Sequence, residues 1–76
     1  MNQNRRKKIW ELVKKLQDIQ SEVEDIKSEE EEYLDNITEN LQSSEKYELS
    51  EQAIECLQDA VNAFEDVIDY LNNATD

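Results

Sequence analysis

The chain of 76 residues contains neither glycine nor proline. Tight turns between strands depend on glycine, asparagine or aspartate, whereas glycine and proline interrupt helices more strongly than any other residues. The composition is instead rich in Glu, Leu, Ile, Lys, Gln and Ala, which together favour helix over strand. The sequence therefore predicts an all-α protein, and its length predicts a single domain over residues 1–76.

Apolar residues in the first half of the chain recur at alternating spacings of three and four residues. This heptad repeat is typical of a helix that packs along one narrow seam, as in a coiled coil. One charged residue, Glu30, interrupts the repeat. We expect a first helix over about residues 4–34. Its predicted seam consists of Ile9, Leu12, Leu16, Ile19, Val23, Ile26, Tyr33 and Ile37.

A second helix is predicted over about residues 45–72, after a connection over about 35–44 that is rich in cap and turn formers. The fold class is then an antiparallel two-helix hairpin resembling a coiled coil. The second helix has an apolar face of about four positions in seven, which is more than one neighbouring helix covers. Its large-residue seam, expected to pack on the first helix, is Tyr47, Ser50, Ile54, Leu57, Val61, Phe64, Ile68 and Leu71.

Beside this seam runs a second one, made mostly of small residues that let helix axes approach closely. A hairpin of this size buries a modest core, and one cysteine without any histidine offers neither an intrachain disulfide nor a zinc site. We therefore expect a homodimer that forms a four-helix bundle. The predicted self-association residues are Leu49, Ala53, Cys56, Ala60, Ala63, Val67 and Tyr70.

The formal net charge of −12 is unevenly spread. Residues 1–15 carry six basic side chains and one acidic one, whereas residues 16–76 carry 19 acidic side chains and two basic ones. In an antiparallel hairpin, the basic run 5–8 lies beside the acidic C-terminal end of the second helix, near Asp69 and Asp76. Charge matching therefore favours the antiparallel orientation.

Acidic side chains line the predicted surface at a density that approaches the charge density of duplex DNA. Such a surface competes with nucleic acid for a basic cleft. The alternative, and the commoner case for acidic helices, is a solvated face that keeps a small oligomer soluble. The candidate partner-binding residues are Asp18, Glu24, Asp25, Glu31, Glu32, Glu55, Asp59 and Asp66.

No catalytic, metal or cofactor site is expected. A nucleophilic cysteine needs a nearby base such as histidine, which Cys56 lacks. The acidic run 29–32 has no glycine with which to form a calcium loop. Direct binding of nucleic acid is disfavoured by the net negative charge, and no apolar run approaches the length of a membrane span. Trp10 lies off the predicted seam, where it either packs against the bundle or serves as an exposed anchor for a partner.

The whole chain resembles a group of short acidic helical proteins of phages and prophages of Gram-positive bacteria. The matching features are the opening segment 5–9 (RRKKI), the centre 33–45 (YLDNITENLQSSE) and a closing helix with Ala53, Leu57 and Ala60 at matching spacing. The sequence departs from the group at Thr38, where proline is frequent. The resemblance implies a phage-related accessory protein, and the group carries no established activity.

Together these features predict a non-enzymatic, cytoplasmic binding protein, in the host cell if a phage encodes it. We expect its acidic face to dock on a basic, nucleic-acid-binding surface of a host protein, for example a defence protein. One alternative is a self-assembling structural or scaffold module, based on the double seam of the second helix. A further alternative is a sponge for nucleotide messengers held by Arg5 and Arg6.

Overall fold

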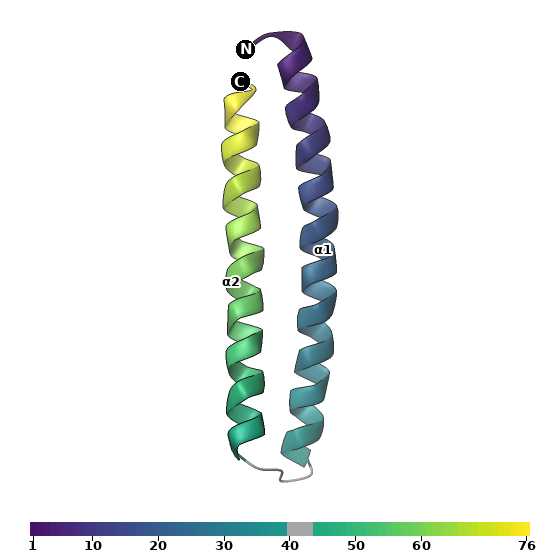
Figure 1. Cartoon of the computed structure of the whole chain (residues 1–76), viewed down its shortest axis with the longest axis vertical. Helices are drawn as coiled ribbons and strands as arrows, with labels where there is room; N and C mark the ends of the chain where they lie inside the picture. Colours follow the sequence, from purple (N-terminus) through teal and green to yellow (C-terminus); the bar gives the residue numbers. More distant parts are fainter. Residues whose placement is uncertain (40–43) are drawn as a thin grey trace.

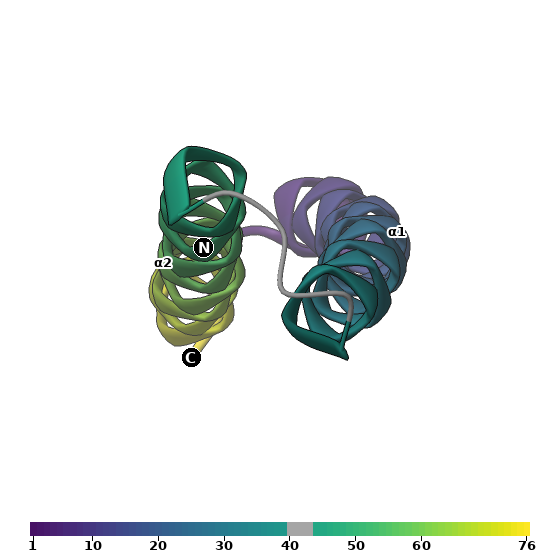
Figure 2. The same ribbon diagram turned by 90° about the horizontal axis from the view of Figure 1, so that it is seen from below.

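The computed structural model describes the backbone of residues 1–39 and 44–76, and the side chains of residues 1–36 and 45–76. Helix α1 spans Gln3–Glu39 and helix α2 spans Ser44–Ala74. The two helices run antiparallel and side by side, so both chain ends lie at one end of a rod of 58 × 15 × 12 Å (Figures 1 and 2). The predicted all-α helical hairpin is confirmed.

Both helices extend further than expected. Helix α1 includes residues 35–39, which were assigned to the connection, and α2 continues past residue 72. Cap and turn formers are only a few tenths of a kcal/mol worse than average in a helix, so without glycine or proline they do not end one. Helix α1 begins after Asn2, whose Oδ1 accepts a hydrogen bond from the Arg5 backbone amide over 2.9 Å. The predicted connection also includes residues 40–43, which lie outside the described residues.

Helix α2 packs on α1 through the predicted large-residue seam. Ser50, Val61 and Ile68 are buried, and the other five members of the seam are half-buried. The sequence expectation for this side of the interface is therefore confirmed. The half-buried members are Tyr47, Ile54, Leu57, Phe64 and Leu71.

Helix α1 meets α2 through a different set of residues from the predicted seam. Ile9, Leu16 and Val23 do face α2, whereas four other apolar residues of the repeat are between 44 % and 53 % exposed, and the side chain of Ile37 lies outside the described residues. The assignment of these four exposed residues to the intrachain seam is wrong. The four exposed residues are Leu12, Ile19, Ile26 and Tyr33. The positions that face α2 in their place are Val13, Gln20, Lys27 and Leu34.

Polar contacts across the seam explain the rotation of α1 about its own axis. The side-chain Nε2 of Gln20 donates a hydrogen bond to the backbone carbonyl oxygen of Val61 over 3.0 Å. The Lys27 ammonium donates to Oε1 of Gln58 one helical repeat further along. The apolar side chains of α1 extend over more of its circumference than the part that α2 contacts. One apolar stripe of α1 is therefore not covered by α2. The observed rotation of α1 gives the polar side chains hydrogen-bond partners on α2 and leaves an apolar stripe exposed.

A hydrogen bond joins the two chain ends. The Arg6 guanidinium donates from Nε to the backbone carbonyl oxygen of Thr75 over 3.0 Å. This oxygen lies at the negative end of the α2 dipole, where a positive charge is stabilising. The basic run therefore lies at the predicted end of the hairpin, although the acceptor of Arg6 is a carbonyl group. Neither helix in the described part of the chain is long and apolar enough to cross a membrane.

Candidate functional site

The helical hairpin has two long faces, one on each side of the seam. Leu12 precedes the seam residue Val13 on α1, and Ala60 precedes the seam residue Val61 on α2. Because both helices are right-handed and run in opposite directions, residues that precede equivalent seam positions lie on the same side of the hairpin. The same geometry places residues four positions after these seam residues, such as Glu31 after Lys27, on the opposite side.

The first side is an apolar face. On α1 it carries the four exposed residues of the heptad repeat, and on α2 it carries the predicted self-association residues. Ala53 and Ala60 are half-buried, and the other α2 members are exposed, with Tyr70 at 75 %. The apolar face consists of Leu12, Ile19, Ile26 and Tyr33 of α1 and Leu49, Ala53, Cys56, Ala60, Ala63, Val67 and Tyr70 of α2.

Sequence reasoning missed the α1 half of the apolar face because it assigned those residues to the interior of the hairpin. The available signal was their spacing of seven residues, combined with the apolar Val13 and Leu34 one position further along. Where Val13 and Leu34 add a further apolar position beside the repeat, the apolar surface of α1 is wider than a two-stranded seam requires. That width indicates a second packing partner for α1 as well as for α2.

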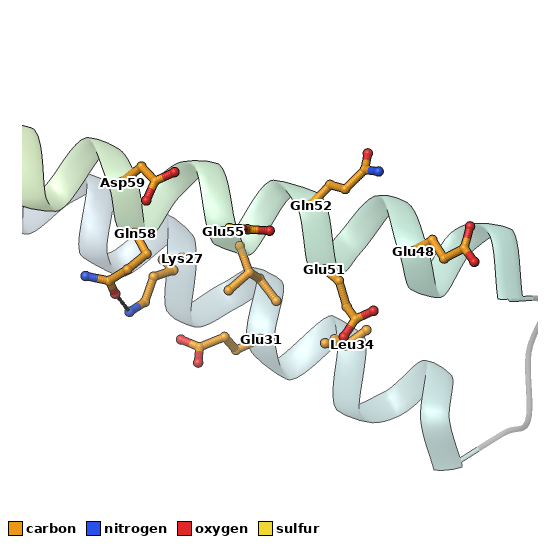
Figure 3. A pocket seen from close by; sticks show the side chains of 10 residues that line it. Lys27, Glu31, Leu34, Glu48, Glu51, Gln52, Glu55, Gln58 and Asp59 are labelled. Atoms are coloured by element: carbon orange, nitrogen blue, oxygen red, sulfur yellow. Dashed lines mark hydrogen bonds between the residues drawn. The ribbon is translucent and has the colours of Figure 1, made fainter.

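The opposite side holds an acidic groove of about 660 Å³ between the two helices, at the half of the hairpin nearer the connection (Figure 3). Five carboxylates and one base line it, and the base, Lys27, donates a hydrogen bond to Gln58. Leu34 and Ile54 supply apolar surface. The acidic groove is lined by Lys27, Glu31, Leu34, Glu48, Glu51, Gln52, Ile54, Glu55, Gln58 and Asp59.

The structure brings together three of the predicted partner-binding residues. Glu31 comes from α1, and Glu55 and Asp59 come from α2. Glu48 and Glu51 complete the acidic lining of the groove and were not among the predicted partner-binding residues. Placing them in the groove requires knowing which flank of α2 lies beside which flank of α1, and the spacing of acids along each helix does not give this.

The remaining predicted acids are exposed but lie elsewhere on the rod. Asp18, Asp25 and Glu32 recur every seven residues on the side of α1 that points away from α2, by helical spacing from the seam. Glu24 lies on the same flank of α1 as the groove, one heptad before Glu31, and Asp66 lies on the outer side of α2. The eight residues therefore belong to more than one surface.

The acidic groove offers groups suited to the non-covalent binding of cations and hydrogen-bond donors. Ionised carboxylates accept hydrogen bonds and attract cations, and the groove gathers them from both helices. In the part of the chain that the structure describes, no group of histidine, cysteine or acidic side chains is arranged to hold a metal ion. Cys56 is a free, exposed thiol on the apolar face.

Trp10 is 47 % exposed and lies on the flank of α1 that also carries the acidic groove, toward the chain ends. Of the two roles considered for it, complete packing within the single hairpin is not observed. Its exposed surface is available to a partner.

Comparison with known proteins gives no match to a family model, to a curated protein or to a solved structure.

Proposed function

We propose that this protein is a non-enzymatic binding module that docks its acidic groove on a basic surface of another protein. The observation that carries the proposal is the convergence of five carboxylates from two helices on one groove. A basic surface covered in this way is closed to nucleic acid, because both ligands compete for the same arginine and lysine side chains.

The lining of the groove fits basic side chains in particular. Arginine and lysine present long aliphatic stems below a charged head. Leu34 and Ile54 offer apolar surface for the stems, and Glu31, Glu51 and Glu55 offer carboxylates for the heads. Charge-assisted hydrogen bonds to carboxylates are about twice as strong as neutral ones. The groove therefore supports recognition of an arginine- or lysine-rich surface.

The resemblance to small acidic phage proteins supports a narrower form of the proposal. In that form the partner is a host protein, such as a nucleic-acid-binding defence protein, and the complex forms in the host cytoplasm. The protein then acts as a DNA mimic. Its negative charge supports this role, because it opposes direct binding of nucleic acid to the hairpin itself.

The proposal is tested by affinity capture from lysate of the host bacterium, at low and at high salt. The groove variant Glu31→Gln/Glu51→Gln/Glu55→Gln is compared with the charge-matched variant Asp18→Asn/Asp25→Asn/Glu32→Gln, which changes the outer row of α1. We expect capture of a basic, nucleic-acid-binding protein to fall about tenfold or more for the groove variant only. Equal losses for both variants, or capture that persists at high salt, contradict groove recognition.

A self-assembling or scaffold role is the second candidate, and the exposed apolar face is the observation that favours it. In this role, association through residues such as Ala60 and Val67 is the function, and the acids only keep the assembly soluble. Function then survives neutralisation of the groove and is lost with Ala60→Glu. The opposite pattern supports docking of the acidic groove.

A further inference from the structure

We propose that a second copy of the chain, running in the opposite direction, covers the apolar face, with α1 lying against α1 of the second copy. The sequence alone assigned self-association to α2. The rotation of α1 about its axis in the hairpin adds a stripe of large apolar residues to the same face. This inference does not depend on what binds the acidic groove.

The first argument is the surface area of the single hairpin. A compact protein of 9.0 kDa has about 4,900 Å² of accessible surface by general scaling. The single chain exposes 5860 Å², an excess of about 1,000 Å² over that scaling. This excess is close to the roughly 800 Å² that each partner buries in a standard protein interface.

The second argument is the thin core. Among the described side chains, the buried apolar residues are Val13, Val61 and Ile68, and none of the three is fully buried. A core of this size does not by itself stabilise a domain of about 70–80 residues. On the apolar face, in contrast, Ile26 is 53 % exposed and Leu49 is 60 % exposed. Covering that face gives the hairpin a second core.

The third argument selects the occupant and its direction. Along the outer edge of the apolar face, α1 carries a row of exposed charges spaced by seven residues: Lys8, Lys15, Glu22 and Glu29. Against α1 of a second copy running the opposite way, Lys8 meets Glu29 of the second copy, and Lys15 meets its Glu22. The row is therefore complementary to itself when reversed, as a two-fold symmetric interface requires.

The alternative direction is not complementary. If both hairpins pointed the same way, two-fold symmetry would place α1 against α2 of the second copy. The row of α2 at the equivalent position consists of Leu49, Cys56, Ala63 and Tyr70, and the next row outward consists of Gln52, Asp59, Asp66 and Asn73; neither row contains a base. Glu22 and Glu29 of α1 would then have no positive charge opposite them, so the reversed direction is favoured.

The distribution of side-chain size fits the same arrangement. The α1 stripe is symmetric about Ile19, with Leu12 one heptad before it and Ile26 one heptad after it. The contact between Gln20 and Val61 sets Ile19 level with Ala60 on the neighbouring helix. A two-fold axis near this level pairs the large residues of α1 with each other. On α2 it pairs small residues near the axis, such as Cys56 with Ala63, and large residues further out, Leu49 with Tyr70.

A charge-exchange experiment tests the proposal. Lys15→Glu and Glu22→Lys are made separately and their association is measured by sedimentation at low salt. We expect each variant alone to have a dimer dissociation constant about tenfold above that of wild type, because like charges replace opposite charges at two contacts. An equimolar mixture restores opposite charges at both contacts, so heterodimers form with wild-type affinity.

The matched control uses Lys14→Glu and Asp25→Lys, which make the same charge changes on the other sides of α1. We expect no preference for heterodimers in this mixture. A wild-type mass of 9.0 kDa at micromolar concentration, or no heterodimer preference for the first mixture, overturns the proposal. Circular dichroism of each exposed-site variant verifies that the helices remain intact.

Disulfide trapping provides a second measurement. In a Cys56→Ser background, Ile19→Cys places a thiol at the proposed symmetry axis, and oxidation should link two copies. Gln17→Cys, on the opposite flank of α1, is the control and should remain uncrosslinked. Absence of the Ile19→Cys link in a dimeric sample contradicts the reversed direction, because in the parallel arrangement that thiol faces α2.

Discussion

The Ser50 hydroxyl donates a hydrogen bond to Oε2 of Glu30 over 2.6 Å, across the seam between the two helices. Ser50 is 3 % exposed and is the polar residue in the large-residue seam of α2, and Glu30 is the charged interruption of the α1 repeat. Each interruption therefore faces the other. A shift of one helix along the other would leave a carboxylate against apolar side chains, so this pair fixes the register.

Ser50→Ala should lower the free energy of unfolding by about 1–2 kcal/mol, because it removes a donor from a carboxylate held in the seam. Urea unfolding followed by circular dichroism measures the change. Ser28→Ala, on the exposed side of α1, is the control and should stay within about 0.5 kcal/mol of wild type. If both variants behave alike, the hydrogen bond adds no stability.

The fold class and the α2 seam were predictable from the sequence because both follow from local preference and spacing. The rotation of α1 about its own axis was not predictable in this way. Heptad counting groups Leu12 with Ile9 as readily as it groups Val13 with Ile9, and only the positions of polar partners distinguish the two. Gln20 donates a hydrogen bond to a backbone carbonyl group of α2, and a pattern of side chains in the sequence does not reveal a backbone acceptor.

The acidic groove shows the same limit of sequence reasoning. Glu31 and Glu55 are each visible as acids on a helix, but their approach to a common groove depends on which flanks of the two helices meet. That relationship is set by the same rotation of α1. The acids of the outer row, such as Asp25, were equally prominent in the sequence and lie on another surface.

Gln20→Ala should lower the free energy of unfolding by about 1 kcal/mol, through loss of the hydrogen bond to Val61 and of partly buried side-chain surface. The matched control is Gln17→Ala, one turn earlier on an exposed position, where the higher helix preference of alanine gives no loss. Thermal unfolding of the two variants gives the comparison. A loss confined to Gln17→Ala would place the seam on the other side of α1.

Two adjacent residues of α2 separate the hairpin core from the apolar face. Ile68→Ala should cost about 2–3 kcal/mol at any protein concentration, because Ile68 is buried against α1. Val67→Ala should be nearly neutral in dilute solution, because Val67 is 43 % exposed in the single hairpin. At concentrations where a second copy covers the apolar face, the loss for Val67→Ala should grow. Unfolding over a hundredfold range of concentration measures both effects.

Trp10, the one tryptophan of the chain, reports on the side opposite the apolar face. Its emission maximum should not change when protein concentration is raised, because a second copy on the apolar face leaves its flank exposed. In a Trp10→Phe background, Tyr33→Trp moves the reporter onto the apolar face, and its emission should shift to shorter wavelength as the dimer forms. A shift at Trp10 without one in the Tyr33→Trp variant would assign the second copy to the flank that carries the acidic groove.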